Sequence, residues 1–335
     1  MKKTLIALAV TAMAATSANA AVIYQHEGTK INLDGRAALE IVSLKDKRTD
    51  LVDRGSRVRV QALQEIGGGF SALANAELRF SSGNNVGGSA RAHRLYGGFT
   101  NKDIGTLTFG RQLTLGDHIP KANYTWEMGG NVLHDSHGKA AHFMSASFGG
   151  VRLAADYYFG TADKASENDG QGFGVGFFYD GKWDKLAFRL GSGYVEQEVG
   201  TAAAENRKKK MAGVGFDIKY DLFTIGLDWA HGKSDKQYAD YGFHHVAARY
   251  SKIDRFELGV KFDVTQSNAL YGEFLWGTGK INDTEGKHRG WFVGVDHKFN
   301  KNVIVYLEGG KSRVKESGAT VQEERRIGLG TRIMF

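Results

Sequence analysis

Residues 30–41 alternate between apolar and polar side chains with a period of two residues. The odd positions carry apolar or small side chains, namely Ile31, Leu33, Gly35, Ala37, Leu39 and Ile41. The even positions carry mostly polar ones, namely Lys30, Asn32, Asp34, Arg36, Ala38 and Glu40. Successive side chains of a strand point to opposite faces, so one face of this strand suits lipid and the other suits water. A strand buried in a parallel sheet is apolar on both faces, whereas a membrane β-barrel with a wet interior needs this alternation in segments of about ten residues.

The same alternation recurs in residues 70–80, 151–159, 223–229 and 256–264, and short polar links join many such segments. After residue 20, no stretch approaches the roughly 18 continuous apolar residues of a spanning helix. The chain has a single proline, which suits a closed sheet because proline cannot donate a backbone hydrogen bond. It has no cysteine and therefore no disulfide framework. The sequence predicts an all-β, transmembrane antiparallel barrel.

The number of strands follows from the segments that keep the pattern. About seventeen segments qualify. Bacterial barrels have an even number of strands, so one of these segments must lie outside the wall. Residues 243–251 fit worst, because His244, His245 and Arg249 interrupt the apolar positions. We therefore predict sixteen strands, with residues 243–251 as a hairpin within an external loop. Residues 199–210 and 281–289 are also predicted to be external loops.

The first twenty residues have the pattern of a secretory signal. Lys2 and Lys3 precede an apolar run, and Ala18-Asn19-Ala20 has the small-x-small pattern of a cleavage site. We expect residues 1–20 to be a cleaved signal peptide and residues 21–335 to form the barrel. Loss of the two lysines would lower the formal net charge from +7 to +5. This modest charge gives no reason to expect nucleic-acid binding.

Four stretches resemble the general diffusion porins of Gram-negative outer membranes. They are residues 21–36, residues 56–69, residues 105–111, and residues 298–302 together with 332–335. The resemblance covers nearly all of residues 21–335. It implies an outer-membrane homotrimer, forming a water-filled channel for ions and small hydrophilic solutes, embedded in lipid and lipopolysaccharide. It also implies that Phe335 is the signal read by the outer-membrane assembly machinery.

By the same resemblance, residues 112–138 fold inward and narrow the channel, which then selects by size and by the charges at its constriction. The resemblance implies a basic side made of Arg36, Arg57, Arg59, Arg111 and Lys139. It implies an acidic and polar side made of Asp117, Asn123, Glu127 and Asn131. Arg111 shares strand parity with Leu107 and Phe109, so a bulge at Gly110 would be needed to turn it inward.

The sequence departs from the enteric members of this family at two positions of the inward segment. Asn123 and Asn131 stand where those relatives have acidic residues, which removes up to two negative charges opposite the basic side. We therefore expect weaker cation preference than in those relatives, and anion selectivity is a hypothesis to test.

Other classes of function leave weaker signals. A channel specific for an anion or a sugar remains an alternative, and Arg36, Arg57 and Arg59 would suit the anion. His134, His137 and His142 with Asp135 form an incomplete metal pattern, and we expect no metal and no cofactor. An outer-membrane barrel enzyme could be built on Asp117 and His118, or on Asp240 and His244, but no spacing supports a catalytic arrangement. We expect no enzymatic activity.

Overall fold

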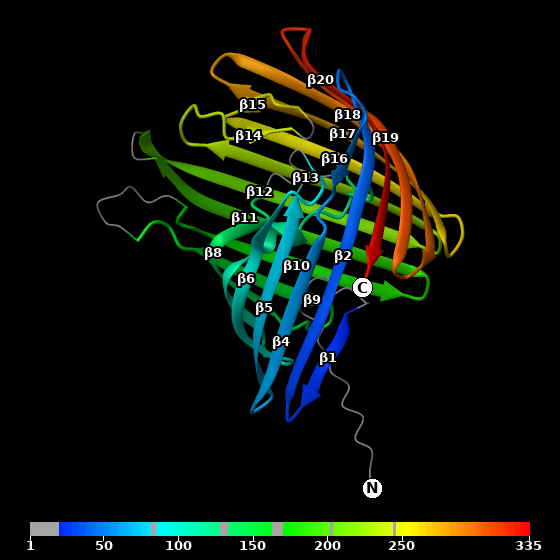
Figure 1. Cartoon of the computed structure of the whole chain (residues 1–335). Helices are drawn as coiled ribbons and strands as arrows, with labels where there is room; N and C mark the ends of the chain where they lie inside the picture. Colours follow the sequence, from blue (N-terminus) through cyan, green and yellow to red (C-terminus); the bar gives the residue numbers. More distant parts are fainter. Residues whose placement is uncertain (1–19, 82–84, 128–132, 163–169, 202–203, 244–245) are drawn as a thin grey trace.

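The computed structural model describes residues 20–81, 85–127, 133–162, 170–201, 204–243 and 246–335 (Figure 1). Within these residues, sixteen strands form a closed antiparallel barrel, as the sequence predicted. In chain order they are β2 (Thr29–Leu44), β4 (Arg57–Gly67), β5 (Phe70–Ser81), β6 (Ser89–Asn101), β7 (Gly105–Leu113), β8 (Ser136–Ser145), β9 (Val151–Tyr158), β10 (Gly172–Trp183), β11 (Leu186–Thr201), β12 (Ala204–Tyr220), β13 (Phe223–Ser234), β16 (Lys252–Asp263), β17 (Asn268–Ile281), β18 (Thr284–Asn300), β19 (Val303–Glu316) and β20 (Ala319–Met334). None of the helices in this described part is long and apolar enough to cross a bilayer.

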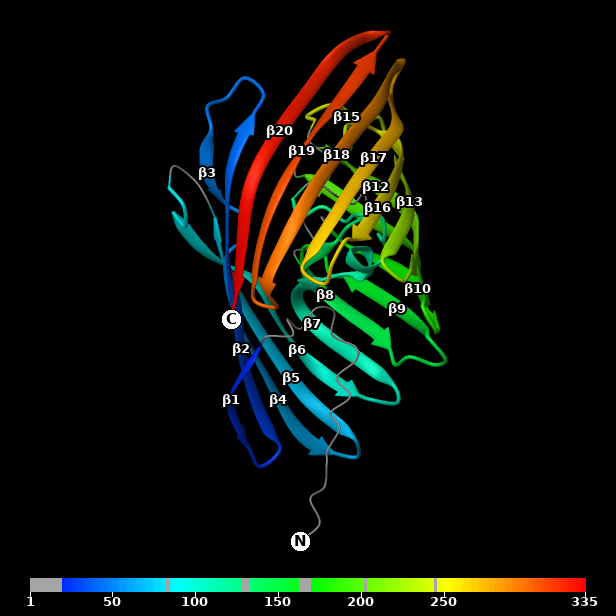
Figure 2. The same ribbon diagram turned by 90° about the vertical axis from the view of Figure 1, so that its right-hand side faces the viewer.

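The barrel closes where its last strand pairs with its first. β20 pairs with β2 from Arg36 opposite Met334 to Leu44 opposite Arg326, and Figure 2 shows the two strands side by side. Strand β1 (Ala21–His26) pairs with the other end of β2. Phe335 exchanges two backbone hydrogen bonds with Gly35, at 3.0 and 3.1 Å, between these two pairings. Strand β3 (Asp50–Asp53) also pairs with β2. Closure therefore leaves little of β2 unpaired.

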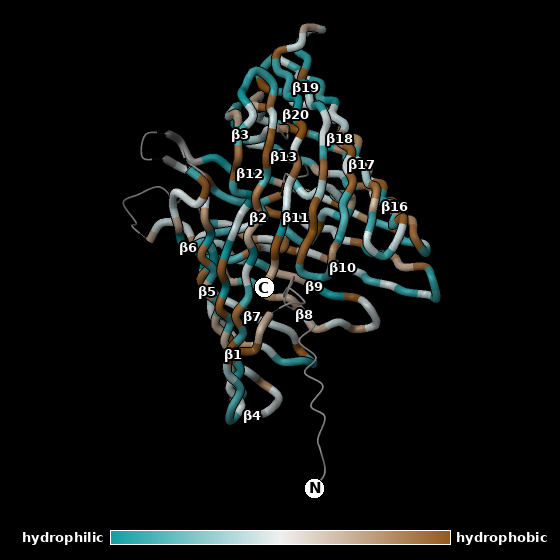
Figure 3. The backbone as a smooth tube through the Cα atoms, turned by 45° about the vertical axis from the view of Figure 1, so that its right-hand side comes forward, coloured by the Kyte–Doolittle hydropathy of each residue, from teal (hydrophilic) through white to brown (hydrophobic). Residues whose placement is uncertain are grey.

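The wall keeps the two faces that the alternation predicted. Asp34 and Glu40 on β2 are only 5% and 1% exposed and face inward, whereas Ile41 on the same strand is 51% exposed. Large apolar side chains of the other strands, such as Leu329, are exposed on the outside in the same way. Figure 3 shows hydrophobic and hydrophilic residues alternating along the strands. An apolar outer belt around a polar interior is the arrangement of a transmembrane barrel.

Two predicted external loops are instead the ends of long strands. β11 and β12 run to Thr201 and from Ala204, and β17 and β18 are joined at residues 282–283, so residues 199–210 and 281–289 lie mostly in strands. Cross-strand pairing of opposite charges explains the extension of β11 and β12. Lys208 lies 3.2 Å from Glu196 and 3.6 Å from Glu198. Such pairs stabilise strands even where the apolar alternation has ended.

Phe243 and residues 246–251 do not belong to a wall strand, which confirms the prediction of sixteen wall strands. They belong to a connection between β13 and β16 that contains two short strands, β14 (Tyr241–Gly242) and β15 (Arg249–Tyr250), paired with each other in a separate sheet.

Candidate functional site

The connection between β7 and β8 lies against the inside of the barrel over residues 114–127, the inner segment, which Figures 1 and 2 both show within the ring of strands. The predicted range of 112–138 was too long, because β7 extends to Leu113 and β8 begins at Ser136. The inner segment begins with a 3-10 helix, η1 (Leu115–His118). Residues 128–132 of the connection lie outside the described residues.

Four carboxylates on different strands accept hydrogen bonds from backbone N–H groups of the inner segment. Asp156 on β9 accepts one at 2.9 Å. Asp228 on β13 accepts the N–H groups of Lys121 and Ala122, at 2.8 and 3.0 Å. Glu273 on β17 accepts two at 2.6 and 2.7 Å, and Glu308 on β19 accepts two more, at 2.5 and 3.2 Å. The segment therefore crosses the interior from β9 to β19, and hydrogen bonds to carboxylates hold it at each step.

Glycines on the inner wall let the inner segment approach the strands closely. A Cβ atom on Gly259 would lie 1.8 Å from the carbonyl oxygen of Ala122, and one on Gly215 would lie 2.4 Å from that of Ile119. Gly191 and Gly226 would also place a Cβ within 3.0 Å of segment backbone. Any larger residue at these positions would push the segment away from the wall.

Arginines form a row on the opposite part of the inner wall. Arg36 on β2 pairs in register with Arg57 on β4, which pairs with Arg79 on β5. Arg36 donates to the backbone carbonyls of Gly55 and Arg54 at 3.1 and 3.3 Å, and these neutral acceptors leave its charge uncompensated. Three adjacent arginines produce a positive surface.

The next row towards the other end of the barrel mixes both signs. Arg59 lies 2.9 Å from Asp34, so that pair is close to neutral. Glu77 is surrounded by Arg79 at 2.7 Å, Arg94 at 3.6 Å and Arg57 at 3.9 Å. One carboxylate therefore serves three arginines, and the wall keeps a net positive charge.

Glu127 lies at the far end of the inner segment and is paired. Its carboxylate lies 2.7 Å from Arg332 on β20 and 3.8 Å from Arg54. The guanidinium of Arg332 also donates to the carbonyl of Trp126 at 2.8 Å and lies over the Trp126 ring, 4.6 Å from its centroid. The acid that the resemblance placed opposite the arginines is thus largely compensated by a cation of the wall.

The structure brings together several of the predicted site residues. Arg36, Arg57 and Arg59 face the interior, and Asp117 and Asn123 lie on the inner segment with exposed side chains. The charge of Arg94 acts on Asp117, and that of Glu127 acts on Arg36, so the two sides face each other. Asn131 lies outside the described residues.

Two predicted basic residues are on the wrong face. Arg111 is exposed and pairs in register with Leu95, which is itself 61% exposed on the outside. The register shift expected near Gly110 does occur, but its extra residue is on β8 and leaves the parity of β7 unchanged. Gln112 therefore faces inward with Thr106 and Thr108, and its amide donates to the Thr108 and Ala140 carbonyls at 3.1 Å. Arg111 keeps the parity of the apolar positions, and its place near the strand end lowers the cost of facing lipid.

Lys139 is the second correction. Its carbonyl accepts from the N–H of Phe159, an outward residue that is 46% exposed, and its ammonium donates to the carbonyl of Gly160 at 2.5 Å. It therefore lies on the outer face near the start of β8. Both positions were carried over from the resemblance, against the alternation in the case of Arg111.

Sequence reasoning missed Arg79, Arg94 and Arg332, together with the anchoring carboxylates. The alternation contained the signal for most of them, because Arg79 shares its parity with Glu77, and Asp228 with Thr224. The sequence did not indicate which inward acids would contact the inner segment, because those contacts form only across the closed barrel.

The histidines near the inner segment do not gather around a common point. His142 lies 2.5 Å from Asp156, and the Nδ1 of His137 accepts from the backbone N–H of Lys139 at 3.0 Å. In the described part of the chain, no group of three potential ligands could hold a metal ion. Burial, with the nearby charges of His142 and Lys121, lowers the pKa of His118 to about 3. His118 is therefore neutral at neutral pH and adds no charge to the segment.

Comparison with known proteins gives consistent matches over the whole chain. A family model described as Gram-negative porin matches residues 7–317. The major outer membrane protein of Pasteurella multocida is 36% identical over 356 residues, covering 100% of both chains. The in-vitro folded trimer form of OmpT, an outer membrane protein of Vibrio cholerae, has a TM-score of 0.72 at 17% identity, covering 92% of this chain and 100% of that one. An anion-selective porin from Comamonas acidovorans has a TM-score of 0.71 at 15% identity, with the same coverage. The two solved structures share the fold.

Proposed function

The chain belongs to the Gram-negative porins and forms an outer-membrane channel for passive diffusion of solutes, and we propose that it is a general diffusion porin whose constriction favours anions. The observation that supports this proposal best is the row of Arg36, Arg57 and Arg79 in register on three neighbouring strands. Glu77, the acid nearest to that row, is shared among Arg57, Arg79 and Arg94, and Glu127 on the inner segment is paired with Arg332. The field at the narrowest section is then positive, and selection depends on diameter and on that field.

The inner segment is our proposed constriction. Its anchoring by carboxylates on β9, β13, β17 and β19 supports a fixed position, and the glycines beneath it support a close fit to one side of the wall. The arginine row would then form the other side of the opening. We also propose that residues 1–20 are removed, which mass spectrometry of the mature protein would test by a first residue at Ala21.

The test of ion preference is the reversal potential of the refolded protein in a planar bilayer under a potassium chloride gradient. We expect a sign that indicates chloride preference. A clear cation preference would contradict the arginine row as the dominant charge. The same recording gives the conductance, and a complete lack of conductance would remove the channel assignment itself.

A second candidate is a channel specific for one class of anion. The register of the three arginines favours it, because a row of guanidinium groups can bind successive carboxylate or phosphate groups. Saturation of the current with rising concentration of one anion, or block by it, would support the specific channel. Currents that rise linearly for chloride, acetate and phosphate would support general diffusion.

We further propose that the channel has no catalytic role. Among the described hydrogen bonds, the side chains of the candidate pair Asp117 and His118 bond neither to each other nor to a serine or threonine hydroxyl, and the lowered pKa of His118 makes it a weak base. Hydrolysis of peptide or ester substrates by purified protein, lost on replacement of His118, would overturn this proposal.

The assembly that we propose is a homotrimer in lipid and lipopolysaccharide. The trimer form of the similar Vibrio cholerae protein supports the first part. Two outward cations on β19 and β20 support the second, since Lys311 pairs in register with Trp291 on one side and with Arg325 on the other, next to an apolar surface that includes Ile327. Light scattering would measure the mass of the assembly. Co-purification of lipopolysaccharide, reduced by Arg325→Glu, would test the lipid contact.

A further inference from the structure

The connection between β13 and β16 also folds into the barrel. Its strands β14 and β15, the inner hairpin, pack on inward-facing residues rather than projecting outside. Tyr250 is fully buried, and its hydroxyl donates to Glu316 at 2.8 Å. The Phe243 ring stacks on His288 with centroids 4.5 Å apart and planes at 12°. We propose that the inner hairpin is a second, fixed narrowing of the channel, placed in series with the inner segment.

Glycines beneath the inner hairpin show that the wall is shaped to receive it. A Cβ on Gly286 would lie 1.8 Å from the hydroxyl oxygen of Tyr250, and a Cβ on Gly279 would lie 2.2 Å from its ring. A Cβ on Gly232 would likewise lie 2.6 Å from the ring of Tyr241. Three strands therefore lack side chains at the points where the two tyrosines rest. An ordinary external loop would not require such gaps.

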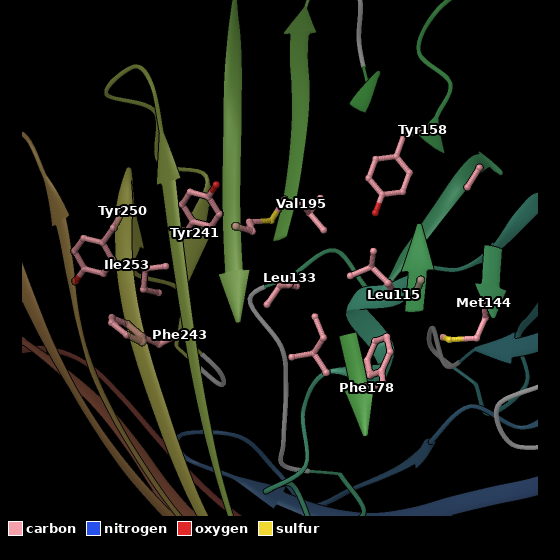
Figure 4. Close-up of a cluster of buried hydrophobic side chains, with 14 of the residues drawn as sticks. Leu115, Leu133, Met144, Tyr158, Phe178, Val195, Tyr241, Phe243, Tyr250 and Ile253 are labelled. Carbon is pink, nitrogen blue, oxygen red and sulfur yellow. The ribbon is translucent and has the colours of Figure 1, made fainter. Parts of the chain in front are cut away.

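Part of the inner wall at this level is apolar, which a water-filled interior does not explain. Ile253 and Val314 have inward parity, yet both are 0% exposed because other side chains cover them. Figure 4 shows Tyr241, Phe243, Tyr250 and Ile253 gathered on one side of the buried cluster, with Leu115 and Phe178 on the other. Removing the hairpin would expose these apolar side chains to water, so burial keeps it in place.

Polar contacts fix the inner hairpin further. Asp240 accepts from the guanidinium of Arg207 at 2.8 and 3.0 Å, and Ser234 donates to the same carboxylate at 2.8 Å. The N–H of Ala247 donates to Gln322 on β20 at 2.6 Å. The hairpin thus reaches from its own strands to the last strand of the barrel. The side chain of Arg249 remains exposed, which leaves a cation on the surface of the hairpin.

The inner hairpin and the inner segment lie at different depths. On β17, the segment bonds to Glu273, whereas Phe243 and Tyr250 lie over Gly277 and Gly279, four and six residues nearer to the strand end. At 3.3 Å per residue these separations are about 13 and 20 Å along the strand. The hairpin is at the end of the barrel opposite Phe335. Solutes would meet it before the constriction when they enter from that end.

Single glycine substitutions give a matched test, which rests on the proposed channel function. Gly286→Ala and Gly279→Ala force Tyr250 to move, whereas Gly290→Ala, on β18 with the same parity as Gly286, finds its nearest atom at 3.4 Å. We expect the first two variants to show larger or fluctuating single-channel conductance, and Gly290→Ala to match the parent. Equal behaviour of all three would overturn the proposal.

Deletion of the hairpin provides a second readout that does not depend on how Tyr250 adapts. In a variant with residues 238–250 replaced by a short Gly-Ser link, we expect a higher conductance than in the parent. In liposome swelling, the entry rate of neutral sugars should also rise, by a larger factor for large sugars than for small ones. Unchanged conductance and size dependence in a folded, conducting variant would contradict a second narrowing. A parent protein that does not conduct would instead refute the channel function.

Discussion

Arg57 and Arg111 carry the same side chain on opposite faces of the wall. Arg57 lies in the inward row between Arg36 and Arg79, whereas Arg111 shares the outer face with Leu95. We expect Arg57→Gln to shift the reversal potential towards cations, because it removes a charge at the constriction. Arg111→Gln should leave the potential unchanged. Equal shifts from the two variants would mean that the faces are assigned wrongly.

Glu127 sets how much of the positive wall is compensated. In Glu127→Gln, Arg332 loses its carboxylate partner, whereas Arg54 keeps its ion pair with Glu40, so anion preference should increase. A hydrogen bond to a charged group contributes about 1.5–3 kcal/mol, and its loss should also loosen the end of the inner segment. Reversal potential and current noise measure the two effects. Glu323→Gln is the control, because Glu323 pairs with Lys311 and Arg325 on the outer face. A similar shift of the reversal potential in Glu323→Gln would mean that surface charge in general, and not Glu127 in particular, sets the ion preference.

At the scale of elements, the local alternation predicted the strands well, because each strand must expose apolar side chains to lipid and polar ones to the interior. It predicted the exclusion of residues 243–251 from the wall, although nothing in that stretch indicated that Tyr250 would rest on Gly279 and Gly286. The inward positions of Arg36, Arg57 and Arg59 were predicted correctly. Arg111 was misplaced because a family resemblance outweighed its own parity, and contacts across the barrel, such as Glu273 with the inner segment, have no local signal.

The inner segment depends on its anchors more than on its own hydrogen bonds. Glu273→Ala removes the acceptor of two backbone N–H groups and leaves them unpaired, at a cost of about 1–3 kcal/mol each where they stay buried. We expect noisier currents and a larger mean conductance, with the barrel itself intact in a heat-modifiability gel. Glu273→Gln keeps an oxygen acceptor and should restore quiet currents. Quiet currents in the alanine variant would show that the other carboxylates suffice.

For the whole molecule, closure joins both β1 and β20 to β2. The C-terminal strand occupies one stretch of its edge, β1 occupies the next, and Phe335 bonds to Gly35 between them. A Cβ on Gly35 would lie 2.4 Å from the Phe335 ring, so the ring lies directly over that glycine. The same residue is also our expected assembly signal. The side chain of Phe335 therefore has both a structural role and a proposed recognition role. Stability of the refolded barrel and assembly in cells must be measured separately to distinguish the two roles.

Phe335→Ala keeps the two backbone bonds to Gly35 and removes only the ring. Protein refolded in detergent should therefore still form the barrel, with a somewhat lower temperature for loss of its folded gel band. In cells, loss of the assembly signal should reduce the amount in the outer membrane far more than that drop in stability explains. Phe299→Ala is the matched control, since Phe299 is an exposed aromatic, 66% accessible, at the end of β18 near the same edge of the barrel. If both variants reached the outer membrane in equal amounts, Phe335 would act only in the closure of the barrel at β2. The assembly machinery would then not depend measurably on an aromatic residue at the C-terminal position.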